Sequence, residues 1–339
     1  MPLIEAIKQF NSVSIVGMEK NTGKTTCLNY VVTRLQEEGR RIALTSIGVD
    51  GEERDILYDT QKPRIVLYEG MVFVTSEKDF EQREFPAEVL SVSGRATPLG
   101  RLVTARAKGI GKVVLSGPSD SVWLQEVISS LCAYNVELTL VDGALSRMSL
   151  ASPAVTDAMI LCTGAACSAQ LYKVIDKTKF RCTLIELDSA ENRVQKRLLP
   201  VENDVWQWQE ACNEWEKIGD SVFTLEKESE KMSKSLGIIY VSGAVTNRFL
   251  DLLSAKGREP VQLIVRDFTK LFIEPATYDK FVRRGGSINV LQKAKLLAVC
   301  TNPVSPDGIY MNPIVLREQM QKAIQLPVYD IVEIEKGRL

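Results

Sequence analysis

Short apolar runs alternate along the chain with longer amphipathic segments, and this pattern predicts an α/β protein. Val13 to Val16 form a β-branched apolar run, and the next segment places apolar residues at helical spacing from Cys27 to Leu35. Further apolar runs within 41–48, 136–144 and 158–163 predict additional strands. Because a helix connects the first two strands, we expect them to be parallel. The predicted fold is therefore a mostly parallel sheet flanked by helices, followed by a second α/β region.

A hairpin is predicted after the second strand. Two short β-rich runs, at 64–68 and 71–76, flank Glu69 and Gly70, and a two-residue connection of this kind favours a hairpin. An excursion at this place carries substrate or partner contacts in many nucleotide enzymes. A purely structural flap is the alternative.

The next segment predicts a helix and then a strand. The helix is expected to run from the 93–101 segment to about Lys108, and the strand to occupy 112–119. Arg95 and Arg101 are candidates for binding a phosphate or a carboxylate, with ordinary exposed arginines as the alternative. Gly117 leaves room for a close backbone approach at the end of the strand.

The length of 339 residues exceeds one average domain, so we expect more than one. Residues 1–188 are predicted to form a nucleotide-binding domain, and residues 236–339 a second α/β domain. Residues 189–235 between them are rich in charge, which favours a solvated helical connection, with a face that contacts a partner as the alternative. The aromatic anchors of this connection are Trp206, Trp208 and Trp215.

The loop after the first predicted strand has the composition of a phosphate-binding loop. Gly17 and Gly23 enclose five residues, one more than the usual pattern, and Gly23 opens the sequence Gly-Lys-Thr-Thr at the start of a predicted helix. Backbone N–H groups of such a loop surround a polyphosphate, Lys24 reaches its terminal phosphates, and the Thr25 hydroxyl ligates Mg²⁺. We therefore expect a nucleoside triphosphate and Mg²⁺ as cofactors; ATP is the nucleotide that we predict, and the loop leaves GTP open. The predicted nucleotide-binding residues of this loop are Gly17, Asn21, Thr22, Gly23, Lys24, Thr25 and Thr26.

Two acidic residues follow predicted strands at the edge where the loop is expected. Ligands of open α/β sheets bind beyond the carboxyl ends of the strands, which places Asp50 and Asp142 near the triphosphate. With Lys24 they are the candidate catalytic residues, and with Thr25 they are the candidate metal ligands. For each carboxylate the alternative is an ordinary acidic turn, which Asp favours before Gly.

Composition excludes several classes of function. Lys and Arg number 42 against 43 for Asp and Glu, so bulk charge predicts neither a nucleic-acid surface nor a membrane surface. Histidine is absent, which excludes histidine triads, histidine metal sites and histidine general bases. The seven cysteines lack a CxxC pair, and we expect reduced thiols in a cytoplasmic protein without a signal peptide or a membrane span.

The five-residue loop resembles that of dethiobiotin synthetases and related P-loop NTPases, and the resemblance implies their fold. The segment Asp142-Gly143-Ala144 is similar to the acidic Glu-Gly-Ala segment of those enzymes, with Asp in place of Glu. In dethiobiotin-synthetase-like proteins an asparagine near a late strand end helps to read the base. The resemblance therefore implies a base-binding role for Asn302.

The amino-terminal half as a whole resembles the P-loop subunit of the reactivase that accompanies adenosylcobalamin-dependent lysine 5,6-aminomutase and ornithine 4,5-aminomutase. The segments that carry this resemblance are 17–26, 45–52, 62–64, 97–101 and 140–157. It implies a MutS-like ATPase subunit and the aminomutase as partners. It further implies that ATP binding and hydrolysis promote release of damaged cobalamin, so that intact cofactor replaces it.

Two other functions fit the same loop. One is a dethiobiotin-synthetase-like ligase that phosphorylates a small carboxylate or carbamate. The other is a regulatory module that binds a nucleotide without useful catalysis, because no general base is visible in the sequence. Many relatives of this loop pair as homodimers, so a homodimer is one expectation for the oligomeric state.

Overall fold

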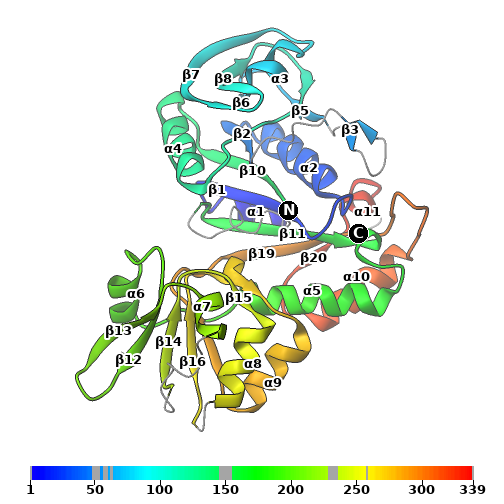
Figure 1. Cartoon of the computed structure of the whole chain (residues 1–339). Helices are drawn as coiled ribbons and strands as arrows, with labels where there is room; N and C mark the ends of the chain where they lie inside the picture. The colour runs from blue at the N-terminus through cyan, green and yellow to red at the C-terminus, as the bar shows by residue number, and fades with distance from the viewer. Residues whose placement is uncertain are drawn as a thin grey trace. The chain divides into compact units, whose positions relative to one another are not determined.

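The computed structural model describes residues 2–47, 54–55, 60–61, 64–144, 155–227, 236–256 and 259–337. The chain divides into two compact units (Figure 1). The first unit combines Met1–Lys179 with Lys295–Leu339, and the second comprises Phe180–Ala294. This division differs from the predicted domains, because the carboxyl-terminal segment returns to the first unit and contributes strands to its sheet.

The first unit is built on a nine-stranded sheet with the order β20-β19-β11-β1-β10-β2-β6-β8-β7. Neighbouring strands from β20 to β6 pair in parallel, and β8 and β7 complete the sheet with antiparallel pairing. The prediction of a mostly parallel sheet flanked by helices is confirmed. The strands are β1 (Ser12–Gly17), β2 (Ile42–Ser46), β6 (Val72–Ser76), β7 (Ala87–Thr97), β8 (Gly100–Ala107), β10 (Leu138–Ala144), β11 (Ala158–Gly164), β19 (Leu296–Asn302) and β20 (Val328–Tyr329).

Helices α2 (Lys24–Glu37) and α4 (Ser121–Leu131) cover opposite faces of this sheet. Leu44 of β2 belongs to the same buried cluster as Leu28 of α2, whereas its neighbour Ala43 packs with Trp123 of α4. Successive side chains of a strand point to opposite faces, so the two helices lie on different sides. Each fully buried Leu or Val side chain contributes roughly 1.5–3 kcal/mol, which makes these two layers the main source of stability for the first unit.

Shorter helices and strands complete the first unit. Asp120 begins α4 with a side chain that accepts a hydrogen bond from Trp123 N, as expected of a helix N-cap. The remaining elements are α1 (Pro2–Ile7), α3 (Glu77–Glu81), α10 (Pro313–Ala323), α11 (Ile331–Glu335), β3 (Arg54–Asp55), β4 (Thr60–Gln61), β5 (Ile65–Leu67) and β9 (Gly111–Val113). Helix α5 (Leu171–Ile185) carries the chain from the first unit into the second.

Two local predictions for residues 64–108 are wrong. The predicted helix from the 93–101 segment to Lys108 is a hairpin of β7 and β8, which turns at Gly100 with a φ of 95°. Pro98 and Gly100 disfavour a helix there, and the β-branched Val103 and Thr104 favour a strand. The predicted hairpin of 64–68 with 71–76 does not form either, because β5 pairs with β9 whereas β6 pairs with β2 and β8.

The second unit contains a five-stranded sheet with the order β13-β12-β14-β16-β18. Within the second α/β domain predicted for 236–339, alternating elements do occur as β14, α8 and β16, but Leu296–Asn302 belongs to the other sheet as β19. The elements are α6 (Asn192–Leu198), β12 (Val205–Gln209), β13 (Glu214–Gly219), α7 (Val222–Lys227), β14 (Ile238–Val241), β15 (Val245–Thr246), α8 (Asn247–Lys256), β16 (Gln262–Val265), β17 (Leu271–Phe272), α9 (Pro275–Arg283) and β18 (Ser287–Val290).

The helical connection predicted for 189–235 is wrong as well. Its described residues contain two short helices and the antiparallel pair β12–β13, which is part of the five-stranded sheet. The three tryptophans lie on these two strands, where their β propensity outweighs the many charges around them.

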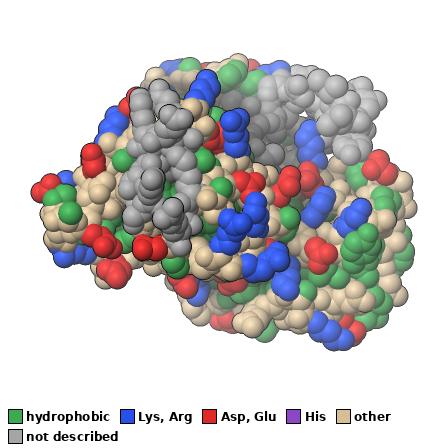
Figure 2. Space-filling view, turned by 60° about the horizontal axis from the view of Figure 1, so that its bottom comes forward, with side chains coloured by type: hydrophobic (Ala, Val, Ile, Leu, Met, Phe, Trp, Pro, Cys, Tyr) green, Lys and Arg blue, Asp and Glu red, His purple; other side chains and the backbone are tan. Residues whose placement is uncertain are grey.

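Surface charge agrees with the composition. Basic and acidic side chains are interspersed on the face shown in Figure 2. In the ranges that the structure describes, no helix is long and apolar enough to cross a membrane.

We predict that the thiols differ sharply in reactivity in the native protein. All seven cysteines are free, but only Cys132 and Cys212 are exposed. Burial raises the pKa of the Cys182 thiol to about 12, so little nucleophilic thiolate forms at mildly alkaline pH. Iodoacetamide should therefore label Cys132 and Cys212 rapidly and spare the others, as measured by peptide mass spectrometry, whereas the denatured protein should label throughout. Rapid native labelling of Cys162 or Cys300 would contradict the packing of the first unit.

Candidate phosphate-binding site

The carboxyl ends of four neighbouring strands meet at one edge of the nine-stranded sheet. Gly17 at the end of β1 lies opposite Ala144 of β10 on one side and Cys162 of β11 on the other. Gly164, the last residue of β11, lies opposite Asn302, the last residue of β19. The loop that joins β1 to α2 leaves from this edge, which is the place where open α/β sheets bind ligands (Figure 1).

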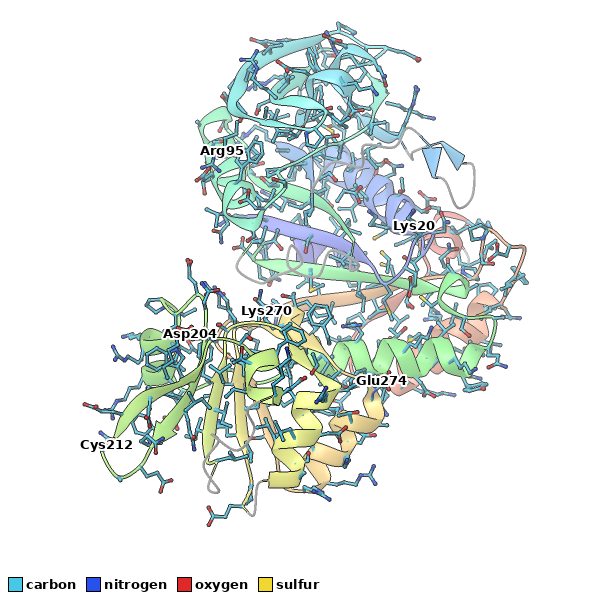
Figure 3. All side chains as sticks on the ribbon, viewed as in Figure 1. Lys20, Arg95, Asp204, Cys212, Lys270 and Glu274 are labelled. Carbon is cyan, nitrogen blue, oxygen red and sulfur yellow. The ribbon has the colours of Figure 1, made fainter. Side chains whose placement is uncertain are left out.

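The β1–α2 loop turns back on itself through a few local contacts. Met18 N donates a hydrogen bond to the Cys162 carbonyl at 2.9 Å, and the Thr22 hydroxyl donates to the Glu19 carbonyl at 3.0 Å. Asn21 and Gly23 have left-handed backbones, with φ of 61° and 84°. Figure 3 shows Lys20 on the same loop. These contacts fix a tight, glycine-bounded loop directly before a helix.

The start of α2 has no side-chain cap. Gly23 occupies the N-cap position and has no side chain that could accept a hydrogen bond from the N–H groups of the first turn. An uncapped helix N-terminus carries a partial positive charge and N–H donors without intrahelical partners. Following a glycine-rich loop, this arrangement suits a phosphate group.

Two glycines are required by the geometry of the loop. A Cβ atom at Gly17 would lie 2.7 Å from the Thr22 hydroxyl oxygen, and one at Gly23 would lie 2.9 Å from the Cβ of Asn302. Both distances are shorter than real Cβ contacts allow. The two positions predicted from the loop pattern are thus positions where the backbone leaves no room for a side chain.

Lys24 and Asp142 form an ion pair at this edge. Lys24 Nζ lies 2.8 Å from Asp142 Oδ1, and the side chains are 25% and 17% exposed. Despite the short distance, Asp142 Oδ1 is a buried oxygen without a well-aligned hydrogen bond. The contact is therefore an ion pair with poor angular geometry, which a bound phosphate or a hydrated cation is able to replace.

Asn302 contacts the phosphate-binding loop. Its Nδ2 donates a hydrogen bond to the Asn21 carbonyl at 3.0 Å, and its Oδ1 accepts from Val304 N at 3.2 Å. The Asn302 amide therefore has a partner for its nitrogen and one for its oxygen, and in this structure it connects the loop to the end of β19. Its role in binding a base stays a prediction.

The structure says less about the other predicted site residues, Thr25, Thr26 and Asp50. Thr25 is partly exposed and Thr26 exposed in the first turn of α2, and Asp50 lies outside the described residues. Among the residues that are described, no group of three or more Cys, Asp or Glu side chains is arranged to hold a metal. Mg²⁺ is commonly held by one or two protein ligands together with phosphates and water, so Thr25 and Asp142 fit the requirement without such a cluster.

A small cavity lies beside the loop. Its volume is about 20 Å³, and it is lined by Thr22, Thr26 and Asn302 with residues from β19 and α11. A space of this size holds about one water molecule and no nucleobase. This cavity is therefore too small for a base, and a base would have to bind elsewhere on the surface.

Arg95 and Arg101 do not contribute to this site. Arg95 of β7 pairs with Glu126 at 3.2 Å, and Arg101 pairs with Glu77 at 3.0 Å (Figure 3). Each is about half exposed, so each pair is a surface contact that contributes little to stability.

Sequence reasoning identified the loop but missed what packs against it. A Cβ at Gly164 would lie 1.9 Å from the Asn302 carbonyl oxygen, and one at Gly117 would lie 1.6 Å from the Ser46 carbonyl oxygen. The close approach predicted at Gly117 is confirmed, whereas the contact of Gly164 with Asn302 joins segments far apart in the sequence. In the sequence, only the small residues 164–166 indicated that another segment packs closely there, and they did not identify Asn302 as the partner.

Comparisons with protein-family models, curated proteins and solved structures found no match for this chain.

We predict that Gly164→Ala loosens the phosphate-binding loop. The added methyl group would displace the Asn302 backbone and break the hydrogen bond from Asn302 Nδ2 to the Asn21 carbonyl. Loss of one such bond costs about 1 kcal/mol, so amide hydrogen exchange in residues 18–23 should accelerate roughly fivefold. Gly94→Ala is the matched control, because a Cβ there meets nothing within 4 Å. Unchanged exchange in Gly164→Ala would show that Asn302 does not hold the loop.

Proposed function

We propose that this chain is a P-loop NTPase that binds Mg²⁺·ATP at the end of β1. The observation that carries the proposal is the Lys24–Asp142 ion pair at the mouth of an uncapped, glycine-bounded loop. A lysine on the first residue of the helix and an acid at the tip of the neighbouring strand are the two charged groups that a metal-bound triphosphate requires.

In this proposal the loop binds and orients the triphosphate. The N–H groups of the first turn of α2 donate to the phosphate oxygens, and Lys24 moves from Asp142 to the terminal phosphates. Mg²⁺ would supply charge neutralisation across the β- and γ-phosphates. Thr25 would hold the ion directly, and Asp142 would accept hydrogen bonds from its water ligands.

When Lys24 leaves Asp142 for the phosphates, the change of ion-pair partner couples nucleotide binding to a conformational change of the protein. A ligand shifts a conformational equilibrium only through its different affinities for the two states. Asp142 lies in β10, two residues before that strand ends at Ala144, so a change of partner at Asp142 acts near the end of the strand. Segments that follow γ-phosphate contacts are common switches in nucleotide-binding proteins.

For the biological role we propose the reactivase that the sequence resembles. The chain would act with a MutS-like ATPase subunit on an adenosylcobalamin-dependent aminomutase, and nucleotide turnover would promote exchange of damaged cobalamin. This assignment rests on the resemblance of the amino-terminal half, and the phosphate site supports only its nucleotide requirement.

The proposal predicts ATP hydrolysis that depends on protein partners. With Mg²⁺, the purified chain should hydrolyse ATP weakly alone and faster with the aminomutase and the MutS-like subunit. Recovery of inactivated mutase should require both ATP and Lys24, since Lys24→Ala removes the charge that contacts the terminal phosphates. Phosphate release and mutase activity are the two measurements.

The same assay separates the alternatives. Rapid turnover with a small carboxylate or carbamate, without stimulation by proteins, would refute the reactivase and favour a ligase. Nucleotide binding with no hydrolysis in any mixture would leave a regulatory module.

A further inference from the structure

The second unit contains a cavity that the proposed nucleotide site does not use. Its volume is about 270 Å³. Lys196 and Arg197 of α6 line it together with Trp206 of β12 and Trp215 of β13, and Leu198, Pro200 and Val201 complete its wall. The aliphatic residues belong to the edge of a buried cluster around Tyr240, so the cavity has an apolar base and a basic margin.

Two indole rings face this cavity from one side of the β12–β13 pair. Trp206 lies opposite Lys217 and Trp208 lies opposite Trp215 in the register of the two strands. Since alternate residues share a face, Trp206 and Trp215 are on the same face of the pair. Flat π faces of this kind favour contact with another aromatic ring.

Trp206 also provides a hydrogen-bond donor without an acceptor. Its Nε1 is buried and has no hydrogen-bond partner. Buried indole N–H groups usually find an acceptor, and an exception in a folded protein calls for an explanation. Trp206 is thus a residue of the cavity wall whose indole N–H has no partner among the described residues.

The two cations at the margin are available for an anion. Lys196 and Arg197 are exposed, and neither forms an ion pair with any described residue. The nearby Lys217 differs, because it pairs with Asp204 at 2.9 Å and with Asp220 at 2.7 Å. Figure 3 shows Asp204 at the start of β12. The margin of the cavity therefore carries two positive charges from α6 that have no ion-pair partner among the described residues.

We propose that this cavity binds a small planar anion, a single aromatic or heteroaromatic ring that bears a carboxylate or a phosphate. The indole faces contact the ring, and Arg197 and Lys196 bind the anionic group. The volume is slightly below the range of about 300–1,000 Å³ that is typical of ligand pockets, which limits the ligand to about one ring. The site is independent of the phosphate-binding loop, so neither proposal requires the other.

The test uses benzoate and phenyl phosphate as probes of the full-length protein. The chain has four tryptophans, so the indole N–H region of a ¹⁵N spectrum should show four signals, and Trp206→Phe assigns the signal of interest. We expect that signal to shift saturably with at least one probe. The neutral ring of benzyl alcohol should bind about tenfold more weakly, because it lacks the charge-assisted contacts to Arg197 and Lys196. Which of the two probes binds more tightly distinguishes a carboxylate from a phosphate.

Calorimetric titration with matched variants decides whether the cavity is responsible. Arg197→Gln should weaken binding of the tighter probe at least about fivefold, whereas Arg193→Gln, which removes one charge from the same helix outside the cavity, should change it less than about twofold. Lys24→Ala should leave it unchanged. Equal losses in the two arginine variants, loss in Lys24→Ala, an equal response to inorganic phosphate or no saturable binding would each overturn the proposal. If Trp206→Phe does not fold, this comparison decides alone.

Discussion

The parallel register of β1 between β10 and β11 is the constraint on which the candidate site depends. All six residues of β1 are buried, so the strand is held on both faces and by both neighbours. A shift of one residue would move its apolar side chains to the opposite face of the sheet. The register that buries Val13 and Ile15 therefore also places Ile15 opposite Asp142 and starts the loop at Gly17, opposite Ala144.

The carboxyl-terminal segment completes this arrangement. β19 pairs with β11 and ends at Asn302, whose amide holds the Asn21 carbonyl from a position 281 residues further along the chain. Gly23 and Gly164 allow that approach because a side chain at either would collide with Asn302. The loop thus depends on both ends of the sequence, although its motif is contained in ten residues.

Elements formed by contiguous residues could be predicted from the sequence, whereas strand pairings between distant segments could not. Gly17 to Thr26 could be recognised because the strand, loop and helix are contiguous, and Asp142 because an acid follows an apolar strand. The β7–β8 pair was predicted as a helix although Pro98 and Gly100 disfavour one and Val103 and Thr104 favour a strand, and its place in the sheet depends on pairing with β6. The membership of β19 in the first sheet depends on pairing across a whole inserted unit, which no local signal specifies.

If the Gly17–Thr26 segment binds a metal-bound triphosphate through Lys24, as we propose, a calorimetric titration with Mg²⁺·ATP should detect it. Lys108→Ala is the matched control, since Lys108 is a half-exposed lysine of the same unit that pairs with Glu88. We predict saturable binding by the wild type and by Lys108→Ala, and binding at least about tenfold weaker in Lys24→Ala. Absence of binding, or equal affinity in Lys24→Ala, would contradict this proposal.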